Sequence, residues 1–302
     1  MTQVFSLASL LAIMLTAFGC FGLAGGSGRP PSGEPILLSG KARSAALCVT
    51  SPNPFKPYTK ELRSPAGVQV LLDSPSDHKH HHALMFAVSA GGVDFWGEHD
   101  ANVVGRQVVE KQARRGRRLI QELIWRAPDG GVKLSERRRL QLWDEPDCTL
   151  LSWESQLRAP ENIGSIELSG AHYVGLGLRP LPSFNAKCRF VYPDGPPGPI
   201  VRGDERLTPG RWCGMVGAVD GKPITIAMMA HPENARTPTR FFTMSTHFAY
   251  LAATLGLHEQ PLSVAAERPL TLRYGVAVWD GEEAPQEMEK TYQRWLKLEG
   301  EK

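Results

Sequence analysis

Short apolar runs separated by turn residues are the feature of this sequence that most constrains its fold. From about residue 45 to about residue 279 the chain shows no long amphipathic helical pattern, and its 30 glycines and 24 prolines interrupt the apolar runs at short intervals. Such an alternation of strand-like segments and turn signals is typical of β-sandwiches and β-barrels. The sequence therefore predicts an all-β fold.

Two of the interruptions predict β-hairpins. Asp129-Gly130-Gly131 separates the runs 118–127 and 132–143, and Asp220-Gly221 interrupts the run 213–230. Asp-Gly suits the tight turns that join antiparallel strands, because glycine adopts positive φ without steric cost. Residues 67–73 and 83–90 predict two further strands, the second one buried.

A helix is predicted only near the C-terminal end, from residue 285 to about residue 298. Pro285 suits the first turn of a helix. Met288, Tyr292 and Trp295 recur at helical spacing and therefore share one face. We expect this face to pack against the outside of a sheet.

The first 20 residues resemble a secretory signal peptide. Residues 7–18 form an apolar run that is shorter than the roughly 20 residues of a membrane span. Cys20 follows small residues, as in a bacterial lipoprotein box, although Ala17 stands where leucine is usual. We predict export, with a lipid on Cys20 as the possible membrane attachment and a periplasmic, lipid-anchored or secreted location. A buried N-terminal helix is the alternative.

The rest of the chain divides into a tether and one domain. Residues 21–44 are rich in Gly, Ser and Pro and predict a flexible tether. Residues 45–302 predict a single β-sandwich domain, long enough to bury a large core. Four cysteines remain after Cys20, and this even number is compatible with two disulfides or with buried free thiols.

Two arginine-rich runs, 111–118 and 136–141, raise the question of nucleic-acid binding. The net charge is only +3, and acidic residues accompany both runs. On a strand, Arg137 and Arg139 point away from Glu136 and Arg138. The pattern favours a solvated sheet face, so we predict no nucleic-acid partner. The sequence lacks the glycine-rich nucleotide motifs and the HExxH zinc motif, and we predict no cofactor.

Four of the nine histidines, His78, His80, His81 and His82, fall within five residues. A proline before them and an apolar run after them suggest an extended segment, with His81 on the opposite face to the other three. His78 and His82 would then lie about 13 Å apart, too far to share one metal ion. His80 and His82 form a cupin-like HxH pair, but no glutamate follows before Glu98. A metal site that combines this pair with a remote ligand remains an alternative.

Without a metal, neutral imidazoles suit sugar recognition and proton transfer near neutral pH. The patch at residues 92–99 follows the histidines and adds Asp94, Trp96 and Glu98. Trp96 could stack on a sugar ring, and the two carboxylates could accept hydrogen bonds from hydroxyl groups. The structural alternative places Trp96 in the core and Asp94 at the cap of a turn.

Two other polar clusters could contribute to the same pocket, since sites on β scaffolds commonly combine separate loops. One lies in residues 229–250 and the other in residues 171–180. Their candidate ligand-binding residues are His231, Asn234, Arg236, His247, His172 and Arg179. Whether the clusters meet depends on the fold.

Taken together, these motifs resemble the PmoA-like domain family. The resemblance runs from about residue 60 to 297 and includes GVDFWGE (92–98), GLGLRP (175–180), HPENARTP (231–238) and RYGVAVWDG (273–281). It implies a β-supersandwich like that of galactose mutarotases and a carbohydrate substrate. It does not imply a true membrane-spanning methane monooxygenase subunit, because no run of the required length follows residue 20.

The resulting hypothesis is an exported carbohydrate-active protein that binds a sugar or oligosaccharide ligand. His81 or His82 would act as general acid and Glu98 or Asp94 as base. The other candidates, His78, His80, Trp96, His172, Arg179, His231, Asn234, Arg236 and His247, would hold the substrate. A non-catalytic carbohydrate-binding or scaffold lipoprotein and a His-ligated metal enzyme are the alternatives, so enzymatic activity remains an open question.

Overall fold

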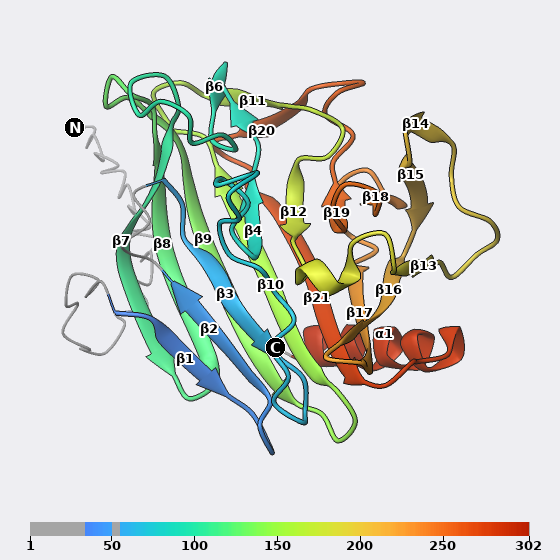
Figure 1. Ribbon diagram of the computed structural model, residues 1–302. Helices are drawn as coiled ribbons and strands as arrows, with labels where there is room; N and C mark the ends of the chain where they lie inside the picture. The colour runs from blue at the N-terminus through green and yellow to red at the C-terminus, as the bar shows by residue number, and fades with distance from the viewer. Residues whose placement is uncertain (1–33, 50–54, 302) are drawn as a thin grey trace, which may run out of the picture.

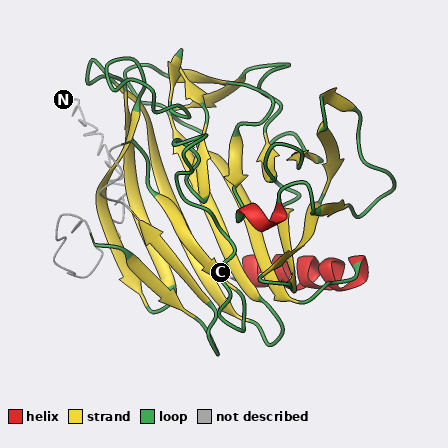
Figure 2. Ribbon diagram, in the orientation of Figure 1, coloured by secondary structure: helices red, strands yellow, loops and turns green. Residues whose placement is uncertain are grey.

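The computed structural model describes residues 34–49 and 55–301. Figures 1 and 2 show a chain built mostly of strands, with one long helix near its C-terminal end. Two large sheets pack face to face and a small third sheet lies at one end, which makes the fold a β-supersandwich. The predicted all-β fold with one C-terminal helix is confirmed.

The nine-stranded sheet A contains, in order, β1 (Ile36–Ser39), β2 (Ala45–Val49), β3 (Tyr58–Arg63), β4 (Leu84–Ala87), β12 (Gly175–Leu178), β19 (Tyr250–Thr254), β18 (Thr239–Met244), β15 (Glu205–Gly210) and β14 (Ile200–Arg202). The eight-stranded sheet B contains β13 (Arg189–Val191), β16 (Trp212–Val219), β17 (Lys222–Ala230), β21 (Leu270–Asp280), β10 (Thr149–Arg158), β9 (Val132–Asp144), β8 (Arg118–Arg126) and β7 (Arg106–Arg115). The four-stranded sheet C contains β20 (Leu262–Ala265), β11 (Ser165–Ser169), β5 (Ser89–Ala90) and β6 (Val93–Asp94). The helices are the short 3₁₀ turn η1 (Pro182–Phe184) and α1 (Pro285–Gly300).

Both predicted hairpins are present. β8 pairs with β9 across the Asp129-Gly130-Gly131 turn, and β16 pairs with β17 across Asp220-Gly221. Both residues of the second turn have positive φ, 50° for Asp220 and 76° for Gly221, as a tight hairpin requires.

Two of the other strand predictions need correction. The run 83–90 is buried as expected, but it divides between β4 of sheet A and β5 of sheet C. Residues 67–73 form only isolated bridges, such as Leu71 with Pro180 and Asp73 with His82. The alternation of apolar and polar residues in this segment therefore reflects the burial of one side. The segment does not pair with a neighbouring strand along its whole length.

The predicted tether at 21–44 is wrong in its last part. Residues 36–39 form β1, which pairs with β2 in the register Ile36–Cys48. Leu38 is fully buried in the core, so this short apolar segment gains enough burial to order the chain there. The predicted signal peptide and Cys20 lie outside the described residues.

Helix α1 lies on the outer face of sheet B, beside β16, β17 and β21 (Figure 1). Met288, Tyr292 and Trp295 are buried, as the sequence predicts. Two glycines of the sheet permit this contact. A Cβ on Gly214 would lie 2.5 Å from Met288 Sδ, and one on Gly275 would lie 3.0 Å from the Trp295 ring.

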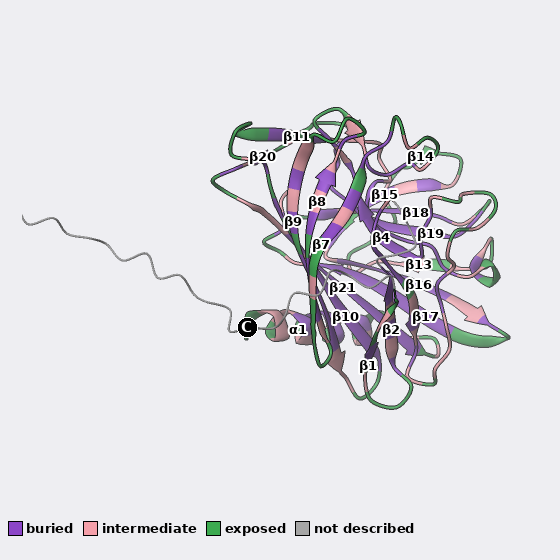
Figure 3. Cartoon of the chain, turned by 90° about the vertical axis from the view of Figure 1, so that its left-hand side faces the viewer, coloured by how far each residue is buried: buried purple, intermediate pink, exposed green. Residues whose placement is uncertain are grey.

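A buried ion pair joins the two large sheets. Glu136 and Arg138 on β9 are almost completely buried and form two hydrogen bonds, at 2.8 and 2.9 Å. Arg138 also donates to the Pro57 carbonyl, just before β3, and to Gln107, which in turn donates to the Phe86 carbonyl of β4. Figure 3 shows that such buried residues concentrate in the strands, whereas many loops are exposed.

The solvated face predicted for residues 136–141 is therefore wrong for three of its charged residues. Glu136 and Arg138 point into the core. Arg139 is also buried, because Glu154 and Glu299 of α1 cover it, at 2.7 and 3.2 Å. Arg137 is exposed, and residues 111–118 are mostly exposed as well.

The described cysteines, Cys48, Cys148, Cys188 and Cys213, are free thiols. Among the described residues, no helix combines the length and hydropathy that a membrane crossing requires.

Replacing Arg138 with Ala should destabilise the protein by roughly 3–5 kcal/mol, because the Glu136 carboxylate would stay buried without its main partner. Urea denaturation measures this change in the free energy of unfolding. Arg137→Ala is the matched control on the same strand and should cost within about 0.5 kcal/mol. Equal losses in the two variants would contradict the role given to the ion pair.

Candidate functional site

The candidate site lies on the face of sheet A that points away from sheet B. Phe86 of β4 contacts Trp125 of β8, with ring centroids 6.1 Å apart, so the side of Phe86 faces sheet B. Neighbouring residues on a strand alternate between faces. Gly177 pairs with the residue next to Phe86 on β4, and Phe242 lies level with Gly177 across β19. Both residues therefore face outward, away from sheet B. Tyr250, two residues from the Phe242 partner on β19, shares this outer face.

The histidine cluster forms two successive turns, so the extended segment predicted from the sequence is wrong. The His78 amide donates to the Pro75 carbonyl at 3.1 Å, and the His81 amide donates to the His78 carbonyl at 2.9 Å. Ser74 and Ala83 at the two ends have positive φ, 47° and 44°. The chain thus reverses within this loop, called the histidine loop (residues 74–83).

The turns bring three imidazole rings together that a straight strand would separate. The ring centroids of His78 and His81 lie 4.8 Å apart, and those of His80 and His81 lie 4.6 Å apart. His81 also stacks on Tyr250 at 5.1 Å. The histidine loop therefore lies directly over the outer face of sheet A.

A cavity of about 240 Å³, called the first cavity, opens beneath this loop. Its lining combines aromatic and apolar side chains with imidazoles and one ion pair. The lining residues are His78, His80, His81, Tyr173, Arg202, Glu205, Phe242, Met244, Phe248 and Tyr250. The sequence indicated the histidines but missed Glu205, Tyr250 and the remaining wall.

Tyr250 Oη and His81 Nδ1 are buried polar atoms of this lining that have no hydrogen-bond partner among the described residues. The hydroxyl of Tyr250 lies over Gly177, where a Cβ would be only 1.8 Å away. Burial raises the pKa of Tyr250 well above its usual value, so the hydroxyl keeps its proton. Unpaired buried polar atoms are costly and indicate a place where a ligand or water can bind.

His80 and His81 are neutral at pH 7. Burial is the main reason that the pKa of His80 falls to about 4 and that of His81 to about 2. Repulsion from Lys56 adds to the effect at His80, and repulsion from neighbouring imidazoles adds to it at both. Each ring can therefore donate one hydrogen bond and accept another.

Glu205 supplies a carboxylate on the other side of the cavity. It accepts hydrogen bonds from Arg202 at 2.6 Å and from His172 at 2.8 Å. Burial opposes ionisation, but these hydrogen bonds hold the pKa of Glu205 below its usual value. The predicted residue His172 thus contacts the site through Glu205.

A second chain of polar groups lies beside the cavity and holds the histidine loop. His82 Nδ1 lies 2.8 Å from Asp73 and Nε2 lies 3.0 Å from Glu98. Glu98 also accepts a 2.6 Å hydrogen bond from the fully buried Lys56, and Asp73 accepts one from Tyr58 at 2.9 Å. We call this chain, Tyr58–Asp73–His82–Glu98–Lys56, the anchor network.

Within the anchor network, the electrostatics favour the charged forms of His82 and Glu98. Burial lowers the pKa of His82, but the hydrogen bonds to Asp73 and Glu98 outweigh it and raise the pKa overall. Burial raises the pKa of Glu98, but the hydrogen bond with His82 and the charge of Lys56 outweigh this effect and lower the pKa overall. Both ring nitrogens of His82 contact carboxylates, which opposes the alternative of an HxH metal pair formed by His80 and His82. In the described part of the chain, no group of three His, Cys, Asp or Glu side chains is arranged to hold a metal ion.

The other residues predicted in the 92–99 patch have structural contacts. Asp94 accepts hydrogen bonds from the amides of Trp96 and Gly97, at 2.7 and 3.1 Å, and so caps a turn. The Trp96 ring is buried between His81 and Tyr173, at 6.0 and 5.9 Å, behind the cavity wall. Both positions follow the structural alternative.

Arg179 supports the histidine loop. Its guanidinium lies 3.6 Å from the Phe248 ring centroid and donates to Asp77 at 3.1 Å. Arg179 does not line the first cavity, but it fixes Phe248, which does.

The four polar candidates predicted in 229–250 do not line the first cavity, although apolar residues of the same stretch do. Asn234 is buried and exchanges hydrogen bonds of 2.7 and 2.8 Å with the backbone of Arg273 on β21. His231 packs against Trp295 of α1, and His247 is exposed. Arg236 donates to the carbonyls of Leu255, Gly256 and Pro261 and lines a different cavity.

Residues 46–293 match the model of a family of unknown function, DUF6807. The chain belongs to the DUF6807 family. No curated protein matches this DUF6807 chain significantly. The matched family model is DUF6807, so the PmoA-like resemblance of the motifs stays a prediction.

Several solved structures resemble the DUF6807 chain at low identity. The GH36 alpha-galactosidase AgaA from Geobacillus stearothermophilus, solved with raffinose, has 8% identity and a TM-score of 0.47, and the match covers 82% of this chain and 41% of that one. AgaB from the same organism has 8% identity and a TM-score of 0.45, with 83% and 40% covered. A candidate aldose 1-epimerase from Escherichia coli K12 has 10% identity and a TM-score of 0.46, with 82% and 99% covered. The chain thus spans less than half of the galactosidases that it matches, and the fold assignment rests on its own sheets.

Replacing His82 with Gln should destabilise the protein more at pH 6 than at pH 9. The raised pKa of His82 means that its contribution is complete below the unfolded value, about 6.5, and is lost as the pH rises through the folded value. Chemical denaturation of wild type and variant at both pH values measures this difference. His247→Gln, at an exposed histidine, is the control. A loss of stability at His82 that stays constant or grows with pH would contradict the charged clamp.

Proposed function

We propose that this DUF6807 protein is an exported carbohydrate-active protein that binds a sugar in the first cavity. The observation that carries the proposal is the lining itself. Aromatic walls, neutral imidazoles and a carboxylate converge on one small space, where Tyr250 Oη and His81 Nδ1 are buried without hydrogen-bond partners in the described structure.

This lining matches the surface chemistry of a sugar ring. Tyr173, Phe242 and Tyr250 offer apolar faces for the C–H side of the ring. His80, His81 and Glu205 offer donors and acceptors for its hydroxyl groups. A volume of about 240 Å³ lies below the roughly 300–1,000 Å³ of sites for drug-sized ligands, which favours a single ring.

The same groups can move a proton. The neutral His81 ring can polarise a substrate oxygen through its N–H, and ionised Glu205 can act as a base from the other side of the cavity. We therefore propose His81 as the neutral hydrogen-bond donor and Glu205 as the base. His82 and Glu98, candidates from the sequence, position the histidine loop, and Asp94 positions the turn that precedes Glu98.

Three parts of the proposal extend beyond the site. The motifs support membership of the wider PmoA-like group, and sugar chemistry is the function that this resemblance implies. The first 20 residues support export, with Cys20 as the lipidated residue. The protein would then handle its ligand in the periplasm, on a membrane or outside the cell.

The second candidate is a non-catalytic carbohydrate-binding or scaffold lipoprotein. In such a protein the histidines and carboxylates have no reason to face each other across one cavity. The convergence of His78, His80, His81 and Glu205 favours acid–base chemistry over binding alone.

Tyr250→Phe should weaken sugar binding by roughly tenfold, because it removes one hydrogen bond to the ligand. Its stability should remain equal or rise, since the lost hydroxyl is buried and without a partner among the described residues. Isothermal titration with a panel of neutral and acidic monosaccharides measures the affinity, and thermal unfolding measures the stability.

Tyr274→Phe is the matched control, because Tyr274 also has a buried hydroxyl without a described partner but lies outside the cavity. It should bind like wild type. The proposed function fails if no sugar binds to wild type, or if Tyr250→Phe and Tyr274→Phe have the same affinity.

A further inference from the structure

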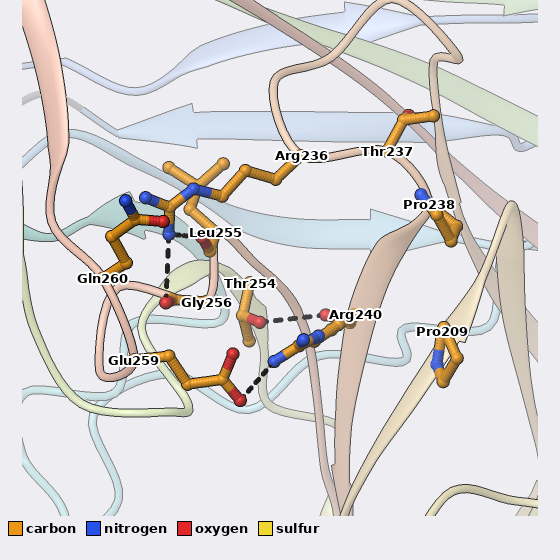
Figure 4. Close-up of a pocket in the computed structure, with 10 residues that line it drawn as sticks. All are labelled: Pro209, Arg236, Thr237, Pro238, Arg240, Thr254, Leu255, Gly256, Glu259 and Gln260. Carbon is orange, nitrogen blue, oxygen red and sulfur yellow. Dashed lines mark hydrogen bonds and ion pairs between the residues drawn. The ribbon is translucent and has the colours of Figure 1, made fainter.

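A second cavity lies on the outer face of sheet A and has a volume of about 420 Å³ (Figure 4). It is distinct from the first cavity and shares no lining residue with it. Its lining consists of Pro209, Arg236, Thr237, Pro238, Arg240, Thr254, Leu255, Gly256, Glu259 and Gln260.

The two cavities are neighbours along the strands β15, β18 and β19. On β18, Arg240 lines the second cavity, and Phe242, two residues later on the same face, lines the first. On β19, Thr254 lines the second cavity and Tyr250 lines the first. Side chains four residues apart on a strand are separated by about 13 Å. A short oligosaccharide can cover this spacing.

A chain of polar side chains connects the cavities. His172 contacts Glu205 of the first cavity at 2.8 Å, and its ring centroid lies 5.8 Å from that of His258. His258 lies 3.7 Å from Glu259, which pairs with Arg240 in the second cavity at 2.5 Å. A ligand that leaves the first cavity in this direction therefore meets polar groups all along its path.

The second cavity carries an excess of positive charge. It contains two guanidinium groups and one carboxylate, that of Glu259. Figure 4 shows Arg236 reaching to Gly256 and Arg240 reaching to Glu259. The Nη1 atoms of the two arginines lie 3.8 and 4.0 Å from the position of a Cβ on this glycine. The absent side chain leaves both cations accessible to one ligand group.

The two arginines differ in how they are held. Arg236 donates three hydrogen bonds to backbone carbonyls and has a left-handed backbone, with φ of 61°. It is a fixed charge. Arg240 is 43% exposed at its side chain and pairs only with Glu259 among the described residues, so it can turn to a ligand.

We propose that the second cavity is a subsite for an anionic group on an oligosaccharide whose neighbouring unit occupies the first cavity. The ligand class is an acidic oligosaccharide that carries a carboxylate or a sulfate ester. Arginine suits both groups because its planar donors match their oxygen atoms. This inference rests on the proposed function, since it assigns the second half of the same ligand.

The test uses two substitutions in the full-length protein that should change the affinity for an acidic oligosaccharide in opposite directions. Arg240→Gln should weaken binding of an acidic oligosaccharide by about tenfold, through the loss of a charge-assisted hydrogen bond. Glu259→Gln should strengthen it by a few-fold, because Arg240 is released and the repulsive charge is removed. Neither change should alter the affinity for a neutral monosaccharide.

The probes are uronate trisaccharides, their methyl esters, sulfated trisaccharides and the single monosaccharides, all measured by isothermal titration. The methyl esters keep the length and remove the charge. Preference for the uronate or for the sulfated probe identifies the source of the anion. Arg115→Gln, at an exposed arginine of β7, controls for the change in net charge, and thermal unfolding confirms that each variant is folded.

The possible outcomes separate the two proposals. If monosaccharides bind and Tyr250→Phe weakens them, but acidic trisaccharides bind no better than esters and Arg240→Gln has no effect, the subsite is overturned and the proposed function stands. If no sugar binds at all, both fail. Opposite effects of Arg240→Gln and Glu259→Gln on acidic probes alone would establish the subsite.

Discussion

The two hydrogen bonds of His82, to Asp73 and to Glu98, are the interaction on which the first cavity depends. His82 stands at the end of the histidine loop, and Lys56 holds Glu98 from below at 2.6 Å. Burying these charged groups is costly, and the cost is offset only because each one is paired. The clamp thereby fixes the loop that places His80 and His81 over the sheet.

Sheet A uses its two faces for different purposes. Its inner face packs on sheet B, and the buried pair of Glu136 and Arg138 reaches backbone carbonyls next to that face. Its outer face carries both cavities and the anchor network. Charged residues on the inner side thus serve the packing of the sheets, whereas charged residues on the outer side line the two cavities or hold the histidine loop.

Local signals predicted the elements well. The two Asp-Gly turns and the spacing of Met288, Tyr292 and Trp295 correspond to the observed hairpins and helix, because each depends on residues close together in sequence. The extended conformation predicted for the histidine loop was wrong for the opposite reason. Its shape depends on positive φ at Ser74 and Ala83 and on a bridge from Asp73 to His82, which alternation does not reveal.

The site was predicted in part. The 78–82 histidines and the 92–99 patch do lie together, with His82 bonded to Glu98. The polar candidates Asn234 and Arg236 do not line the first cavity, because they use their donors for backbone carbonyls elsewhere. Glu205 carried no sequence signal, since a single glutamate in a strand resembles any surface residue.

The sequence by itself determined the all-β class, the hairpins, the helix and the presence of an unusual concentration of imidazoles. These follow from short-range periodicity and composition. Only the tertiary structure decided which charged residues are buried between the sheets and which face outward. It also decided that Glu205, Tyr250 and Arg240 join the histidines on one face, because strands distant in sequence become neighbours only when the sheet forms.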